Sequence, residues 1–196
     1  MNKNRNGFQV MLGLIGMIKP LLGVMCIAII MGCIGNLMAI FITILGGAAI
    51  GNLLGEVTGI SMKMIFVLLV VFAVLRGVLR YAEQASNHYI AFKLLARIRH
   101  QIFASLRKLA PAKLDGKEKG NLISIITSDI ELLEVFYAHT ISPIAIAAIT
   151  SLVMVAFIGQ FHVGLGVLAA VFYLLVGLAV PVVNSKAGQK LSLIHI

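Results

Sequence analysis

The sequence predicts an all-α membrane protein in which four spans are accompanied by long helical extensions outside the bilayer. Two stretches carry no Asp, Glu, Lys or Arg, and these run from Pro20 to Gly55 and from Val135 to Ser185. A membrane-spanning helix needs about 20 apolar residues to cross roughly 30 Å of hydrocarbon, so both stretches are long enough to hold spans. Charged residues make up 12% of the chain and hydrophobic residues 60%, whereas charged residues reach about 25% in soluble domains. An ordinary soluble fold is therefore excluded.

The positions of the basic residues predict the orientation of the spans. Of the 16 Lys and Arg residues, three precede the first span, ten lie from Arg76 to Lys119, and two follow the last span. Lys63 alone falls on the opposite side of the membrane. Because Lys and Arg accumulate in short loops that are not translocated, we expect the N-terminus, the central segment and the C-terminus to be cytoplasmic. The net charge of +9 is then explained by membrane anchoring rather than by nucleic-acid binding.

The first span is expected over about residues 18–50. It is too long for the hydrophobic core of a cleaved signal peptide, which has about 7 to 15 residues, so we expect it to be retained. Two cysteines in this span, Cys26 and Cys33, lie about 10 Å apart along a straight helix, too far to form a disulfide with each other. Apolar packing and an interhelical thiol pair are the two interpretations of these residues.

The other three spans are expected over about residues 61–82, 136–158 and 163–183. A helix that begins near Ser61 needs about 20 residues to cross, so it has to carry arginine into or near the inner leaflet. The third and fourth spans are separated by one short polar turn. We expect Pro143, in the third span, to mark a helix kink rather than a site.

The central segment, residues 84–134, is expected to be a cytoplasmic coupling region rather than a simple loop. Apolar residues recur in it at helical spacing, at Ile90, Leu94, Leu95, Ile98, Ile102, Leu106 and Leu109. The helix of the second span should therefore continue beyond the membrane and end before Pro111. A charged tip, residues 112–119, precedes a second helical run that leads into the third span. The tip is either a solvated turn or a contact surface for a cytoplasmic partner.

A polar stripe on the second span is the candidate translocation pathway. Arg76, Arg80, Glu83 and Asn87 are separated by four, three and four positions, so they share one helix face. Charges near a membrane usually face a bundle interior or a water-filled cavity. The arginines would attract carboxylates of a cargo, and Glu83 can pair with Arg80. The alternative for the arginines is that they only snorkel to the interface.

Histidines near the stripe are further candidates. His88 lies about a quarter turn from the stripe and is either a hydrogen-bonded packing residue or a ligand. His139 and Thr140, in the third span, are additional pathway candidates. The sequence predicts no catalytic residues and no metal-ligand cluster.

The segment after the tip resembles a known family. Residues 120–130 read GNLISIITSDI, which is similar to the G-[DE]-L-x-x-x-[ILV]-x-x-D-[ILV] run of ABC exporters of the type-1, six-helix class, with Asn121 in place of the usual acid. The resemblance implies a type-1 transmembrane bundle with four of its six spans in residues 1–190, and a second half-transporter as partner, either identical or different. In that family the tip docks into the ATPase domain. This implies coupling to the ATPase by Lys113, Leu114, Asp115, Gly116 and Lys117.

Three shorter runs resemble the half-transporters that act in cytochrome bd assembly, also described as thiol-reductant exporters. They are RYAEQASNH at 80–88, FKLLARIR at 92–99 and ISP at 141–143, with Gln84 in place of the usual Arg. This resemblance implies a haem or cargo contact at His88. No G-x-x-x-x-G-K-[ST] phosphate loop occurs in the sequence, so ATP and magnesium are expected in an ATPase domain beyond these residues.

The last six residues, 191–196, match the translation of a common transposase adapter used in sequencing libraries. We therefore expect the natural chain to continue after Lys190. The alternative is a coincidental apolar tail.

The sequence thus predicts the transmembrane subunit of an ATP-driven ABC exporter in the bacterial cytoplasmic membrane. The expected cargo is a small polar or anionic solute, and the resemblance implies a thiol, an amino acid or haem. A lipid or drug exporter of the same class is one alternative, and it should have a more apolar cavity. A four-span scaffold or sensor that binds a cytoplasmic partner is an alternative from another class.

Overall fold

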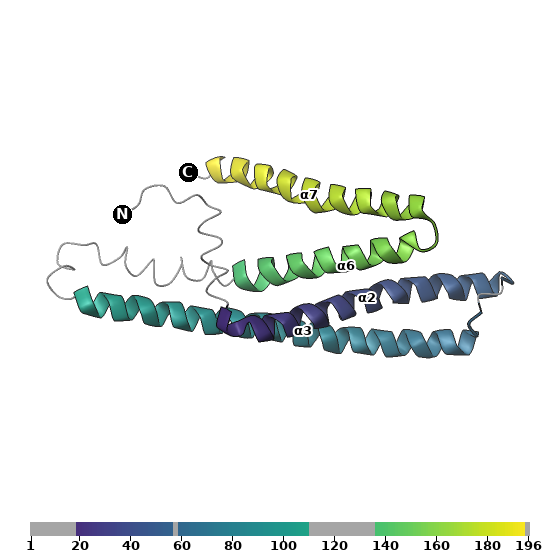
Figure 1. Cartoon of the computed structure of the whole chain (residues 1–196), viewed down its shortest axis with the longest axis horizontal. Helices are drawn as coiled ribbons and strands as arrows, with labels where there is room; N and C mark the ends of the chain where they lie inside the picture. The colour runs from purple at the N-terminus through teal and green to yellow at the C-terminus, as the bar shows by residue number, and fades with distance from the viewer. Residues whose placement is uncertain (1–18, 57–58, 110–135, 195–196) are drawn as a thin grey trace. The chain divides into compact units, whose positions relative to one another are not determined.

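A computed structural model describes residues 19–56, 59–109 and 136–194. Within these ranges the chain forms helices and no strand, which confirms the predicted all-α class. The elements in Figure 1 are η1 (Lys19–Leu21), α2 (Leu22–Leu53), α3 (Met62–Leu109), the π-helix η3 (Tyr137–Ile141), α6 (Ser142–Gly159) and α7 (Val163–Ile194).

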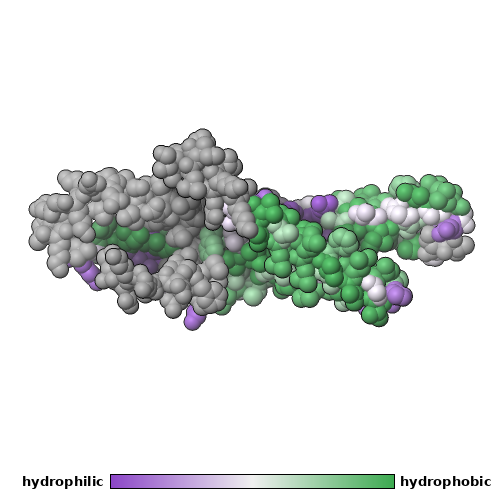
Figure 2. Space-filling model, turned by 90° about the horizontal axis from the view of Figure 1, so that it is seen from above, coloured by the Kyte–Doolittle hydropathy of each residue, from purple (hydrophilic) through white to green (hydrophobic). Residues whose placement is uncertain are grey.

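Four helices in the described part of the chain are long and apolar enough to cross a membrane. They are Lys19–Leu53, Met62–Lys108, Ala138–Gly159 and Val163–Ser185. Large apolar side chains are exposed along all four, and hydrophobic surface dominates the described helices in Figure 2. Soluble proteins rarely expose contiguous apolar surface of this extent, whereas lipid solvates it. The protein is an integral membrane protein.

The longest helix, α3, has 48 residues, which corresponds to a length of about 70 Å. That is more than twice the thickness of the hydrocarbon core, so α3 is long enough to extend well beyond a bilayer. Its first turn is capped by Ser61, whose hydroxyl accepts a hydrogen bond from the Met64 amide at 3.3 Å. The predicted tip and the coupling residues 113–117 lie outside the described residues.

The first compact unit comprises residues 1–146, and in it α2 packs along α3. Gly32 of α2 is tightly surrounded, because an added Cβ would meet the Ile146 side chain of α6 and lie 3.2 Å from Cδ of Glu83 on α3. Glycine leaves room here for both neighbouring side chains, and a larger residue would require them to shift. Both cysteines are free, and the thiol of Cys33 lies 4.0 Å from the carbonyl of Ile146.

A small apolar cluster joins α3 to η3 in the same unit. It is formed by the buried residues Ile90, Ala91, Leu94 and Ala138. Pro143, where a kink was expected, is the second residue of α6 and follows the π turn of η3, which ends two residues earlier. Proline has no N–H to bond the carbonyl four residues before it, so a regular α-helical ladder cannot form there.

The second compact unit comprises residues 147–196 and contains the rest of α6 together with α7. A very short turn joins the two helices, as predicted. Glycines allow the turn to be tight, because a Cβ on Gly166 would lie 2.8 Å from Cα of Gly159. His162 caps α7, since its Nδ1 accepts a hydrogen bond from the Gly164 amide at 3.0 Å.

Candidate functional site

The four residues of the predicted polar stripe differ in exposure. Arg76 is exposed, and the side chain of Arg80 is 60% exposed. Glu83 and Asn87, by contrast, are buried, with exposed fractions of 1% and 2%. The stripe therefore runs from an open end at the arginines to a closed end against α2.

An ion pair links the open and closed ends of the stripe. Nη1 of Arg80 donates a hydrogen bond to Oε2 of Glu83 at 2.6 Å, and Nδ2 of Asn87 approaches Oε1 of Glu83 at 3.5 Å. A buried carboxylate is costly unless it is paired and hydrogen-bonded. The charge of Glu83 is thus balanced by a guanidinium group that is itself largely exposed.

A cavity of about 380 Å³ opens between α2 and α3. Its described lining residues are Gly32, Gly35, Asn36, Arg76, Arg80 and Glu83. Binding sites for small molecules typically measure about 300 to 1,000 Å³, so the volume suits a metabolite-sized solute. Guanidinium groups bind carboxylates or phosphates through two parallel hydrogen bonds, which gives this cavity a preference for anions.

Three of the four predicted pathway residues line this cavity, and Asn87 does not. Its Oδ1 is buried and makes no hydrogen bond within the described part of the chain. Three residues of α2 were missed by sequence reasoning, namely Gly32, Gly35 and Asn36. The signal for Asn36 was present, because a polar amide within a long charge-free span usually faces a bundle interior.

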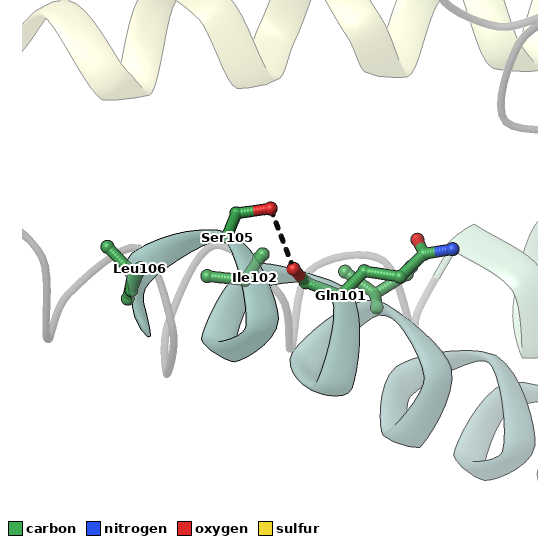
Figure 3. Close-up of a pocket in the computed structure, with 5 residues that line it drawn as sticks. Gln101, Ile102, Ser105 and Leu106 are labelled. Atoms are coloured by element: carbon green, nitrogen blue, oxygen red, sulfur yellow. Dashed lines mark hydrogen bonds between the residues drawn. The ribbon is translucent and has the colours of Figure 1, made fainter. Parts of the chain in front are cut away.

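His88 is half-buried and lies away from the cavity, beside η3. Its ring stacks on Phe92 with centroids 5.8 Å apart and meets the edge of His139 with centroids 5.7 Å apart. Thr140, on the same π turn, also lies outside the cavity lining. Because His88 lines neither this cavity nor the depression in Figure 3, neither offers a porphyrin slot at this ring. A haem contact stays a prediction.

A second depression, of about 240 Å³, lies on α3 beyond the stripe (Figure 3). Its described lining consists of Ile98, Gln101, Ile102, Ser105 and Leu106, all from one helix. The hydroxyl of Ser105 donates to the carbonyl of Gln101 at 2.9 Å, as the dashed line in Figure 3 marks. With no charged group in its described lining, this depression is a poorer candidate for a solute site than the cavity between α2 and α3.

Long apolar helices, an α3 much longer than a bilayer is thick and a charged cavity between the first two spans define an integral membrane protein with a polar site. The chain belongs to the family of ABC transporter transmembrane regions, whose model matches residues 25–192.

Several curated relatives are similar to the chain. A probable ABC transporter ATP-binding/permease protein of Haemophilus influenzae is 47% identical over 186 residues, which cover 95% of this chain and 34% of that protein. The glutathione/L-cysteine transport system ATP-binding/permease protein CydC of the same organism is 25% identical over 118 residues, covering 60% of this chain and 20% of that protein. CydD of Bacillus subtilis, from the same kind of system, is 27% identical over 113 residues, covering 58% and 20%. The chain spans about a third or less of the length of these relatives.

Proposed function

We propose that the chain forms the transmembrane part of an ATP-driven exporter that moves a small polar or anionic solute through the cavity between α2 and α3. The observation that carries this proposal is the pair of exposed arginines at the mouth of a metabolite-sized cavity, in a chain of the ABC transporter family. A lipid or drug path would be expected to have an apolar lining instead.

The proposed machine includes parts that lie outside these residues. Relatives described as ATP-binding/permease proteins support an ATPase domain on the same polypeptide, which would bind ATP and magnesium. A second half-transporter would complete the bundle. Lys113, Leu114, Asp115, Gly116 and Lys117 would receive the ATP-driven movement. The protein would lie in the bacterial cytoplasmic membrane with its N-terminus inside.

The cargo we favour is a small thiol-containing amino acid or peptide. The names of the CydC and CydD relatives support this choice, although their identity to the chain is low. The cavity supplies suitable chemistry, because Arg76 and Arg80 can bind carboxylates while the exposed amide oxygen of Asn36 can accept a hydrogen bond from an ammonium or amide group. Haem, with a contact at His88, is the alternative cargo that the motif around this residue suggests.

Arg80 would act as the movable element of the site. In the structure it is bound to Glu83, while its largely exposed guanidinium faces the cavity. A cargo carboxylate can compete with Glu83 for the same guanidinium, because both anions bind to its planar fork of donors. Binding of cargo would then loosen the contact between Arg80 and Glu83 and make the site responsive to occupancy.

The test is cargo-stimulated ATP hydrolysis by the full-length protein reconstituted in lipid. We expect glutathione or cysteine to stimulate hydrolysis in the wild type, Arg80→Ala to abolish stimulation, and Arg80→Lys to retain part of it. Lys63→Ala, at the start of α3 and remote from the cavity lining, is the matched control and should behave like the wild type. Unchanged stimulation in Arg80→Ala would remove the cavity from the pathway, and stimulation by lipids or apolar drugs alone would favour the alternative exporter.

A further inference from the structure

We propose that His88 of α3 and His139 of η3 form a binding site for one divalent transition-metal ion of the copper, nickel and zinc class. The site is distinct from the charged cavity, and its existence does not depend on the proposed transport function. Neutral imidazole is the commonest protein ligand for these ions.

The distance between the two rings suits a shared ion. Their centroids lie 5.7 Å apart, and their planes are inclined at 79°. An imidazole nitrogen binds such an ion at about 2.0 to 2.1 Å, which places the centroids of two coordinating rings about 5 to 5.5 Å apart in tetrahedral or trigonal geometry. The observed separation of 5.7 Å is slightly larger than this range, so ion binding would require the side chains to rotate toward a shared point.

The backbone on both sides of the site is held by packing. Ala138, next to His139, is fully buried in the cluster that contains Ile90 and Ala91, close to His88 in sequence. The ring of His88 is further restrained by stacking on Phe92, at an interplanar angle of 28°. The imidazoles are therefore presented by two elements that are already fixed to one another, which reduces the entropy lost on binding.

The π turn contributes directly to this geometry. One π turn adds a residue relative to an α-helix and so rotates the preceding residues by about 100° around the helix axis. His139 lies within that turn and is exposed, which gives an ion a route of entry. Single π turns of this kind are found frequently at functional sites.

The site would use two protein ligands, with water or another small ligand completing the coordination. In the described part of the chain, no group of three or more His, Cys, Asp and Glu side chains could hold a metal. An ion with open positions is expected to exchange readily and to be accessible to solutes, in contrast to a closed structural zinc site.

The experiment uses the full-length protein without a polyhistidine tag, titrated with Cu²⁺ and followed by electron paramagnetic resonance. The wild type should bind one ion and show hyperfine coupling to two imidazole nitrogens, a signature that needs no variant to interpret. In His88→Gln and in His139→Gln, the copper signal should show coupling to at most one nitrogen from this site. Each variant should also bind Cu²⁺ at least about tenfold more weakly, because removing even a group that only supports a metal ligand typically lowers affinity by about that factor. His100→Gln, an exposed histidine on the same helix, is the matched control and should match the wild type.

Three results would overturn the proposal. The first is no stoichiometric binding of Cu²⁺ to the wild type. The second is a two-nitrogen signal that survives in His139→Gln. The third is a haem absorption band that depends on His88 in a protein that does not bind the bare ion, because this would assign the histidine to haem instead. Because each readout is taken on folded protein isolated as a single species by gel filtration, a misfolded variant cannot imitate the expected loss.

Discussion

Glu83 is the most deeply buried charged side chain in the described part of the molecule, at 1% exposure, yet its counter-ion, Arg80, is 60% exposed. The ion pair thus connects a buried carboxylate with an exposed guanidinium group. The carboxylate cannot recruit water, so it depends on the guanidinium, whereas the guanidinium can still interact with a solute in the cavity. The contribution of such a pair to stability lies mainly in avoiding an unpaired buried charge.

This arrangement predicts unequal effects for the two partners. Arg80→Ala leaves the Glu83 carboxylate buried without its counter-ion and should destabilise the protein by about 1 to 3 kcal/mol, less than the 3 to 5 kcal/mol typical of fully buried pairs because Arg80 is largely exposed. Glu83→Gln keeps the shape and removes the charge, so its effect should be smaller. Thermal unfolding of the purified protein in detergent measures both.

The double variant Arg80→Ala/Glu83→Gln provides the control for this interpretation. It should recover most of the stability lost in Arg80→Ala, since no unpaired charge remains. If the losses simply add, the ion pair does not couple the two residues and the proposed dependence of Glu83 on Arg80 is wrong.

The polar stripe could be predicted from sequence because the helical repeat alone fixes which residues share a face. Whether a stripe residue is open or buried depends on the neighbouring helix. Nothing in the sequence indicated that Gly32 would bring α2 against Glu83, so the difference between the exposed Arg80 and the buried Asn87 could not be foreseen. The contact of His88 with His139 was hidden for the same reason, since the two lie on separate elements.

At the scale of elements, α2 packs tightly at Gly32 against side chains of both α3 and α6. Gly32→Ala would place a Cβ against the Ile146 side chain and 3.2 Å from Cδ of Glu83. Overpacking of this kind typically costs about 1 to 3 kcal/mol, so we expect a clear fall in the unfolding temperature. The same change should narrow the cavity and weaken stimulation by cargo.

Gly46→Ala is the matched control for the packing prediction, because it lies on the same helix and an added Cβ there would have no atom within 4 Å. Alanine favours helix over glycine by about 1 kcal/mol, so this variant should be neutral or slightly stabilised. Equal destabilisation of both variants would show that helix backbone flexibility, rather than close packing at Gly32, determines the effect.

The turn between α6 and α7 gives a second prediction at this scale. His162→Ala removes the acceptor for the Gly164 amide and should cost about 1 kcal/mol of local stability, the usual loss for an N-cap. His162→Asn supplies an alternative cap and should retain most of it. Hydrogen exchange of the first α7 amides measures the effect locally, and protection in the alanine variant equal to that of the wild type would contradict the capping role.

The length of α7 illustrates what composition can and cannot predict about an element. A span was expected over residues 163–183, and an apolar run of that length is sufficient for a crossing. The helix nevertheless continues through Pro181 to Ile194. A proline within a helix interior is disfavoured in water, but helices in membranes tolerate it because neighbouring groups satisfy the freed carbonyl. The apolar run therefore locates the crossing, which the structure has at Val163–Ser185, but not the end of the helix.

For the molecule as a whole, the distribution of charge was the most informative part of the sequence. Charge-free stretches located the apolar helices, because a charged residue is costly in lipid wherever it falls. Helical periodicity in the central segment predicted that α3 would extend past the bilayer. The packing between elements is not encoded in such patterns, since lipid and protein interior are about equally apolar and exposed and buried faces look alike in sequence.

The orientation of the spans is the prediction that belongs to the whole molecule. The α2–α3 loop contains Glu56 and only one nearby basic residue, Lys63, while Ser105 lies far along α3 on the side where basic residues accumulate. About 43 residues of helix separate Met62 from Ser105, or roughly 65 Å at 1.5 Å per residue, more than the 30 Å hydrocarbon core, so the two ends must lie on opposite sides.

Single cysteines introduced into a Cys26→Ala/Cys33→Ala background test this orientation. Because basic segments are retained in the cytoplasm, a membrane-impermeant maleimide added to intact cells should label Glu56→Cys and should label Ser105→Cys only after permeabilisation. Labelling of the cysteine-free background would expose a failed control. The reverse pattern would invert the topology and place the proposed ATPase contact on the wrong side of the membrane. Labelling of both cysteines in intact cells would mean that α3 does not cross the bilayer at all, which its length and apolar surface make the least compatible outcome.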